Sequence, residues 1–215
     1  MKTKFELTCS QILTLPSKGF ETTALEVFKW QAKYCPPYAK YLELLGVRAE
    51  EINGLQDIPF LPVDVFRNET VLSGSKKIPD LIFESSGTSG SETSRHYVID
   101  PDLYKAVARR GFELQYGALK EYCILALLPH YMERQHSSLV YMVKGFMDES
   151  GHPDNGFYLN QHADLYSKLL YLKEQSQKTI LIGVSYALMD FASSYQMNFP
   201  NLILMETGGM KGIVV

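Results

Sequence analysis

The chain has 215 residues, of which 46% are hydrophobic and 21% charged, and this composition is typical of a folded globular protein rather than a disordered one. Its 21 basic and 24 acidic residues give a formal net charge of −3, so no basic field attracts nucleic acid or anionic lipid. The five histidines and three cysteines are too scattered along the chain to predict a structural metal site.

The first 80 residues are expected to form a helical and extended N-terminal segment that packs on the main domain. Apolar residues recur at the spacing of an α-helix in two stretches, which Pro36-Pro37 separates. Gly46 suits the end of the second helix. The stretch 54–80 contains several prolines and is typical of an extended connector. The helical positions are Leu25, Phe28, Ala32, Tyr38, Leu42 and Leu45.

Residues 81–215 are expected to form an α/β domain. Short apolar runs alternate with helical segments there, which predicts a mostly parallel sheet with flanking helices. Asp100-Pro101 is typical of a helix start, and two further helices are expected over 139–147 and 165–172. The pattern does not predict the order of the strands in the sheet. Strands are expected at 81–83, 96–99, 122–128, 180–184 and 202–205.

No apolar run reaches the roughly 18 residues that a membrane-spanning helix needs. The charged N-terminus is not followed by an apolar segment of signal-peptide length, so we expect a cytoplasmic protein. Cys9, Cys35 and Cys123 are odd in number and show no paired spacing, which does not indicate a disulfide framework.

A hydroxyl-rich loop at 84–94 is the most informative segment of the sequence. Seven of its eleven residues carry hydroxyl groups, and Gly87 and Gly90 allow the backbone to bend tightly. Backbone N–H groups and hydroxyls in such a loop can surround phosphate oxygens without a fixed positive charge. The loop is neither a Walker A motif nor a dinucleotide fingerprint. Its place directly after a predicted strand favours phosphate binding, and a flexible linker is the alternative interpretation.

The run Ser85-Ser86-Gly87-Thr88-Ser89-Gly90 resembles the nucleotide loop of the adenylate-forming enzymes, the superfamily of the acyl-CoA synthetases. Further motifs make the chain similar, more narrowly, to the acyl-protein synthetases of bacterial bioluminescence operons, the LuxE type. This resemblance extends over roughly residues 20–212. Its motifs are found at 58–62, 94–96, 128–134, 137–142, 156–159, 183–188 and 206–212.

The resemblance implies ATP-dependent activation of a fatty acid as its acyl-adenylate, followed by transfer of the acyl group to a protein thiol. It implies ATP and Mg²⁺ as cofactors, with Mg²⁺ neutralising part of the phosphate charge. It further implies acyl reductase or acyltransferase proteins as partners. Two alternatives stay open: an acyl- or aryl-CoA ligase of the phenylacetate-CoA ligase type, and a non-catalytic truncated binding module.

The same resemblance assigns roles to residues. The loop Ser85, Ser86, Gly87, Thr88, Ser89 and Gly90 would hold the phosphates, and Glu206, Gly208 and Gly209 would lie against the nucleotide base. A plain strand-to-helix turn is the alternative interpretation of this second motif.

Four residues near other strand ends complete the predicted site. His130 and Arg134 are the candidate catalytic residues, because a histidine and a guanidinium that follow a buried strand are placed to meet a carboxylate or phosphate. Tyr131 and Tyr186 are the candidate substrate-binding residues. Surface decoration for Arg134, a hydrogen-bonded core role for His130 and a packed helix-start role for Tyr186 are the alternatives.

The resemblance is incomplete at the C-terminus, since the family continues beyond the position of Gly212 whereas this chain reads Ile213-Val214-Val215. The segment that holds ribose, the small mobile domain and the acyl-accepting cysteine have no counterpart here. We therefore expect the N-terminal half of an enzyme, with the 81–215 nucleotide-binding region truncated, and do not expect these residues alone to complete a catalytic cycle.

Overall fold

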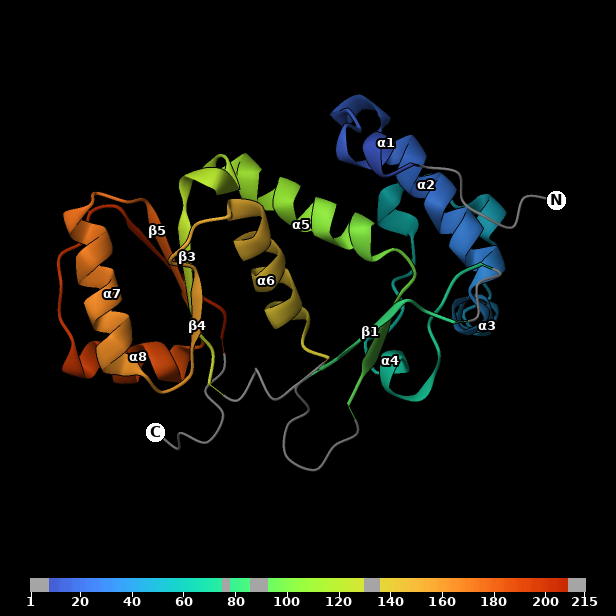
Figure 1. The fold of residues 1–215 in the computed structure, drawn as a ribbon. Coiled ribbons are helices and arrows are strands. Elements are labelled where there is room, and N and C mark those ends of the chain that lie inside the picture. The colour runs from blue at the N-terminus through green and yellow to red at the C-terminus, as the bar shows by residue number, and fades with distance from the viewer. Residues whose placement is uncertain (1–7, 75–77, 86–92, 130–135, 209–215) are drawn as a thin grey trace. The chain divides into compact units, whose positions relative to one another are not determined.

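The computed structural model describes residues 8–74, 78–85, 93–129 and 136–208 (Figure 1). The chain divides into two compact units, Met1–Val107 and Ala108–Val215, which we call unit 1 and unit 2 and describe separately. The fold is mixed α/β, with N-terminal helices and a parallel sheet with flanking helices, which confirms the predicted fold class. The division near residue 80 stays a prediction. No helix within the described residues is long and apolar enough to span a membrane.

Unit 1 begins with the short helix α1 (Cys9–Leu13), followed by α2 (Ser17–Tyr34) and α3 (Pro36–Leu44). The two predicted helices are confirmed as α2 and α3. Their junction lies at Cys35, after which Pro36 occupies the first position of α3, where a missing N–H costs nothing. The buried residues of the two helices form one small cluster, made of Phe28, Cys35, Tyr38 and Leu42.

The connector after α3 is less extended than the sequence suggests. It contains the 3₁₀ turns η1 (Ala49–Glu51) and η2 (Leu55–Asp57) and the short helix α4 (Val65–Asn68). Such single turns need only one or two i→i+3 or i→i+4 hydrogen bonds. They are too short to show an apolar periodicity, so the sequence does not predict them. The Tyr38 hydroxyl donates to the Pro59 carbonyl over 2.6 Å and fastens the connector to α3.

The strands β1 (Leu81–Glu84) and β2 (Arg95–Val98) confirm two of the predicted strands. They pair with each other in antiparallel register, with Leu81 opposite Val98, and form a separate two-stranded sheet. The hydroxyl-rich loop is therefore the connection of a hairpin, rather than a strand-to-helix loop of the parallel sheet.

Unit 2 contains the C-terminal half of α5 and the parallel sheet. The predicted cap of α5 is confirmed, because the Asp100 carboxylate accepts the Leu103 N–H over 2.9 Å. The elements are α5 (Pro101–Tyr116), η3 (Leu119–Glu121), β3 (Cys123–Leu127), α6 (Ser138–Ser150), β4 (Gly156–Tyr158), α7 (His162–Glu174), β5 (Thr179–Gly183), α8 (Ser185–Ser194) and β6 (Leu202–Glu206).

The four strands of unit 2 pair in the order β4-β3-β5-β6, and every pair is parallel. Helix α6 lies on one face of the sheet, and α7 and α8 lie on the other (Figure 1). All residues of β3 and β5 are buried, as continuous apolar strands covered on both faces must be. The sheet therefore forms a closed core whose accessible features are its edges and the loops that leave it.

Candidate functional site

The strands β3, β5 and β6 end at the same edge of the sheet because they run parallel. We call this edge, made of Leu128-Pro129, Gly183–Tyr186 and Glu206–Gly208, the carboxyl edge. It collects the described parts of three predicted motifs, at 128–134, 183–188 and 206–212, although these parts are up to 80 positions apart in the chain. The parallel sheet is what brings them together.

The strand order places a topological switch point on this edge. From β3 the chain passes through α6 to β4 on one side, whereas from β5 it passes through α8 to β6 on the other side. The loops that follow β3 and β5 therefore diverge, and open α/β sheets bind ligands in the crevice outside such a point. The place between β3 and β5 is thus the part of the edge best suited to a ligand.

Tyr186 crosses the switch point. It lies in the first turn of α8, half-buried against the core, and its hydroxyl donates to the Pro129 carbonyl over 3.4 Å, a long hydrogen bond. Both sequence interpretations thus describe part of its environment, since it packs at a helix start and also reaches the end of β3. The substrate-binding role itself stays a prediction.

Gly183 allows the closest packing at this edge. A Cβ atom at this position would lie 2.7 Å from Leu188 Cδ2 and 3.2 Å from the Leu127 carbonyl oxygen. Real Cβ atoms do not approach other atoms so closely, so a larger residue would have to displace the Leu188 side chain and would crowd the Leu127 carbonyl at the end of β3. The glycine therefore holds the start of α8 close against the end of β3.

Glu206 links the loops that follow β5 and β6. Its Oε1 atom accepts a hydrogen bond from the Ser185 hydroxyl and another from the Gly208 N–H, the latter over 2.7 Å. The Ser185 N–H donates in turn to the Gly208 carbonyl over 3.3 Å. The Ser185 hydroxyl, and secondly the Gly208 N–H, hold the pKa of Glu206 below its usual range. The carboxylate is therefore ionised at neutral pH.

The turn after β6 depends on glycine. Gly208 has a φ of 74°, in the left-handed region that residues with a side chain rarely adopt. Directly before it, the Thr207 N–H and hydroxyl both donate to the Gly183 carbonyl, over 3.0 and 3.3 Å. The Glu206–Gly208 segment is thus held in place by hydrogen bonds. The residues after Gly208 lie outside the described part of the chain, so the strand-to-helix interpretation and the role against a nucleotide base both stay predictions.

Ser85 belongs to unit 1, where it follows β1. Its N–H donates to the Ser94 carbonyl over 2.9 Å, and its hydroxyl oxygen accepts the Ser94 N–H over 3.0 Å. Arg95 Nε lies 3.3 Å from Glu84 Oε1 one step further along the hairpin. These bonds close the base of the hydroxyl-rich loop and give Ser85 a structural task in it.

Nine of the predicted site residues lie outside the described residues. Among the described residues, those that the structure brings together are Tyr186, Glu206 and Gly208. No three His, Cys, Asp or Glu side chains in the described part of the chain form a group that could hold a metal ion. The nine residues are Ser86, Gly87, Thr88, Ser89, Gly90, His130, Tyr131, Arg134 and Gly209.

Ser185 is a site residue that the motif analysis misses as a candidate. Its signal is its position, since it directly follows a buried strand and starts a helix. Its role becomes visible only through Glu206, a partner that lies 21 positions further along the chain. Thr207 is missed for the same reason.

The chain matches no protein-family model, no curated protein and no solved structure. Its function is therefore inferred from its own residues and from the geometry of the carboxyl edge.

Proposed function

We propose that this protein binds ATP at the carboxyl edge of its parallel sheet and activates a fatty acid as the acyl-adenylate, for transfer to a protein thiol. The observation that carries the proposal is the switch point between β3 and β5, together with the turn that Glu206 joins to it. The resemblance of the loops at 85–90, 128–134 and 206–212 to those of adenylate-forming enzymes supports the choice of nucleotide and reaction.

The residues present at the edge fit a nucleotide. None of the described residues donates to the second carboxylate oxygen of Glu206, so this oxygen is available to a ribose hydroxyl or to Mg²⁺. Mg²⁺ at nucleotide sites is usually held by one or two carboxylates together with the phosphates, which agrees with a single acidic side chain here. Gly208 presents backbone without a side chain, so a flat ring can approach it closely.

The proposed reaction asks the protein mainly to align two anions. A carboxylate oxygen of the fatty acid attacks the α-phosphorus, and the bond to the pyrophosphate oxygen breaks, which leaves the acyl-adenylate and pyrophosphate. A thiolate then attacks the acyl carbonyl, and AMP leaves as the thioester forms. Bound ATP supplies the reactive anhydride and Mg²⁺ offsets the developing charge, while the loops at the edge fix the geometry.

Calorimetric titration of the 215-residue chain with ATP and Mg²⁺, and with a non-hydrolysable acyl-adenylate mimic, tests the proposed site. We expect saturable binding of both, with the mimic binding more tightly because it occupies the nucleotide and acyl positions together. We expect Glu206→Gln to weaken ATP binding about five- to tenfold, because a neutral amide accepts hydrogen bonds less strongly than a carboxylate. Glu174→Gln, at the far end of α7, is the matched control and should bind as the unchanged chain does.

The outcome that overturns the proposal is a folded chain that binds neither ATP nor the mimic. If both bind, carboxylate-dependent exchange of pyrophosphate into ATP tests the first reaction step. Product analysis then separates the two thiol acceptors, because a protein-linked thioester supports the proposal and a coenzyme A thioester contradicts it. Gly87→Val is a separate test of the sequence-based prediction that the hydroxyl-rich loop binds phosphate, since a branched side chain there should block the approach of backbone to phosphate and weaken phosphate binding at least tenfold.

A further inference from the structure

The sequence contains two Asn-Gly pairs, Asn155-Gly156 in unit 2 and Asn53-Gly54 in unit 1. Such a pair can modify itself, because the backbone nitrogen of the glycine can attack the side-chain carbonyl carbon of the asparagine. A glycine has no side chain to obstruct this attack and adopts the required backbone conformations easily. The reaction needs a side-chain amide and a glycine nitrogen that are free to turn toward each other.

The side-chain amide of Asn155 is held at both ends. Its Oδ1 atom accepts the Ile124 N–H over 2.7 Å, and its Nδ2 atom donates to the Met147 carbonyl over 2.9 Å and to the Ser150 hydroxyl oxygen over 3.3 Å. The Ser150 hydroxyl donates in turn to the Tyr122 carbonyl over 2.6 Å. The amide therefore connects the last turn of α6 with the start of β3, and it cannot rotate toward the following glycine without breaking these hydrogen bonds.

The nitrogen of Gly156 is held by the sheet. Gly156 is the first residue of β4 and lies opposite Leu125 of the parallel strand β3. The Tyr158 carbonyl accepts the Leu128 N–H over 3.0 Å. Backbone groups two residues apart point to the same side of a strand, so the Gly156 N–H also points toward β3. The two groups that would react are thus both engaged with β3, and they become free only when β4 leaves the sheet.

The strand β4 is the part of the sheet that is best placed to open. It has three residues, lies at the edge of the sheet and pairs with β3 alone. One ion pair fastens the residue before Asn155, since Lys168 Nζ of α7 lies 2.5 Å from Asp154 Oδ1, with both side chains half-buried. Short edge elements open at a lower free-energy cost than core strands do. The opening of β4 therefore controls how often the amide of Asn155 is free.

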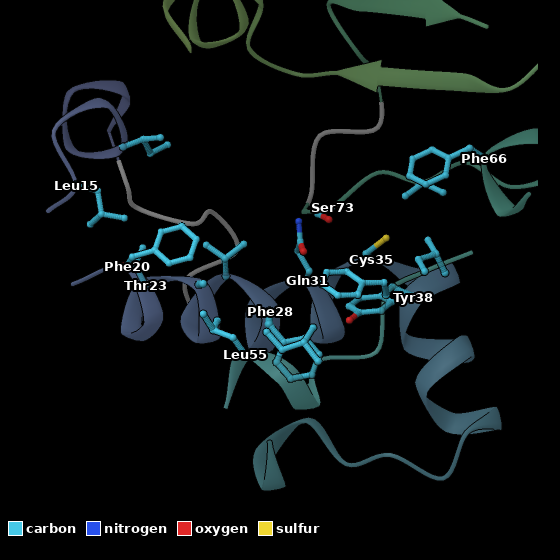
Figure 2. A pocket seen from close by; sticks show the side chains of 17 residues that line it. Leu15, Phe20, Thr23, Phe28, Gln31, Cys35, Tyr38, Leu55, Phe66 and Ser73 are labelled. Carbon is cyan, nitrogen blue, oxygen red and sulfur yellow. The ribbon is translucent and has the colours of Figure 1, made fainter. Parts of the chain in front are cut away.

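The second pair provides an internal reference. Asn53 is exposed, and within the described residues its side chain makes a single hydrogen bond, from Nδ2 to the Glu51 carbonyl over 3.0 Å. It lies in the connector of unit 1, where the nearby Leu55 lines an apolar cavity of about 740 Å³ rather than a filled core (Figure 2). Gly54 is buried and Gly156 half-buried, so the pairs differ mainly in how their side-chain amides are held.

From these contacts we propose that Asn155 is a deamidation site that the folded sheet keeps unreactive and that reacts when β4 opens. In the open state the Gly156 nitrogen bonds to Asn155 Cγ and loses its proton. The bond from Cγ to Nδ2 breaks, and the amide group leaves with a proton as ammonia. Water then opens the cyclic imide at either carbonyl and gives an aspartyl or an isoaspartyl residue. The net change consumes one water and releases one ammonia, without an oxidant or a cofactor.

Either product hinders the return of β4 to the sheet. An aspartyl carboxylate has no N–H group, so the Met147 carbonyl and the Ser150 hydroxyl oxygen would face a negative charge in place of a donor. An isoaspartyl residue lengthens the backbone by one carbon, which shifts the rest of β4 out of register with β3. An opening of β4 that leads to reaction is therefore recorded as a permanent change in the chain.

Peptide mapping by mass spectrometry on the full chain measures both rates, in buffer and in guanidinium chloride, with fragment spectra that separate Asn155 from Asn160. In denaturant the two Asn-Gly pairs should react at similar rates, because neither is held. In buffer the rate at Asn155 should be at least about thirtyfold lower than in denaturant, whereas the rate at Asn53 should fall only a few-fold. A rate at Asn155 in buffer within a few-fold of the denatured rate, or equal slowing at both pairs, would overturn the proposal.

Two variants test the control by β4. Lys168→Met removes the ion pair with Asp154 and should raise the rate at Asn155 in buffer about three- to tenfold, without changing the rate in denaturant. Lys173→Met, at an exposed position of the same helix, is the matched control and should leave both rates unchanged. An unchanged rate in Lys168→Met contradicts the control by β4. All rates are measured without nucleotide, so a failure of the proposed function leaves this proposal unaffected.

Discussion

The two units solve the problem of burying apolar side chains in different ways. In unit 2 the strands β3 and β5 are covered on both faces, and their residues are buried throughout. In unit 1 the buried cluster around Phe28 and Tyr38 is small and adjoins an open cavity. Large apolar side chains remain accessible there, with Phe20 56% and Phe60 82% exposed. A parallel sheet that requires two covering layers fills its space, whereas a pair of helices that buries one stripe each leaves space for another molecule.

The largest difference between the two units is expected when an apolar side chain of each is shortened. Leu125 in β3 is 0% exposed, so Leu125→Ala should lower the free energy of unfolding by about 2 to 5 kcal/mol. Val27 lines the cavity of unit 1, and Val27→Ala should cost less than about 1 kcal/mol, because the lost methyl groups already face open space. Urea denaturation measured by circular dichroism compares the two. Equal costs would mean that the core of unit 1 is as well filled as that of unit 2.

Adding volume is the reverse experiment. Ala126 is enclosed in β3, so Ala126→Leu should destabilise the protein by about 1 to 3 kcal/mol through overpacking. Ala24 lines the cavity, and Ala24→Leu should change the free energy of unfolding by less than about 0.5 kcal/mol. Trp30 is the single tryptophan of the chain and lies in unit 1, so its fluorescence reports the second variant directly. A large loss of stability in Ala24→Leu would show that the cavity is not open.

Tyr38 tests how firmly the connector is held against the unit 1 cluster. Tyr38→Phe removes the hydroxyl that donates to Pro59 and should cost about 0.5 to 1.5 kcal/mol at pH 7. Burial, assisted by Tyr41 and Cys35, raises the pKa of Tyr38 from 10.0 to about 12. A raised pKa stabilises the fold fully below pH 10, and this contribution is lost as the pH rises toward 12.

The stability deficit of Tyr38→Phe should therefore shrink above pH 10 and reverse its sign before pH 12, which denaturation curves at several pH values would show. Tyr171→Phe, at an exposed position of α7, is the matched control and should show no such trend. A deficit that stays constant up to pH 12 would contradict the buried environment of Tyr38.

Surface ion pairs should give the smallest effects and should not distinguish the two units. Arg67 lies 3.2 Å from Asp64 in unit 1, and Arg109 lies 3.4 Å from Glu149 in unit 2, with all four side chains substantially exposed. Replacing either arginine by alanine should cost about 0.2 to 1 kcal/mol in low salt and less in 0.5 M salt. If the changes in the free energy of unfolding differed by more than about 1 kcal/mol between the two variants, one of the ion pairs would contribute more than an exposed surface pair does.

The strands of the sheet differ in how far the sequence predicts them. The runs at 122–128, 180–184 and 202–205 are confirmed as β3, β5 and β6. In β3 and β5 the continuous apolar run corresponds to burial of every residue, whereas no residue of β6 is fully buried. The strand β4 is not predicted, since the three residues Gly156–Tyr158 carry no period of their own. It exists through its pairing with β3, and such non-local pairing leaves no local mark in the sequence.

The candidate site divides in the same way. Glu206 and Gly208 are predicted because an acidic residue and a glycine after a strand form a recognisable motif. Ser185 and Gly183 matter through Glu206 and Leu188, and those contacts depend on the order β4-β3-β5-β6. A motif can thus predict which residues follow a strand, whereas the residues that they contact on neighbouring strands and helices follow only from the sheet topology.

The strand order also determines how long β3 remains without its neighbour β5 while the chain is being synthesised. Cys123 of β3 pairs with Thr179 of β5, which is 56 residues further along the chain. At about 5 to 20 residues per second, β3 waits roughly 3 to 11 seconds on the ribosome before its inner neighbour emerges. Until β4 emerges, β3 has no partner strand of its sheet, and from then until β5 emerges it has only the three-residue β4, so this apolar strand is open to aggregation during synthesis. The central position of β3, which buries it fully in the finished sheet, therefore also leaves it without its inner neighbour for longer than a strand whose partner follows directly in the chain.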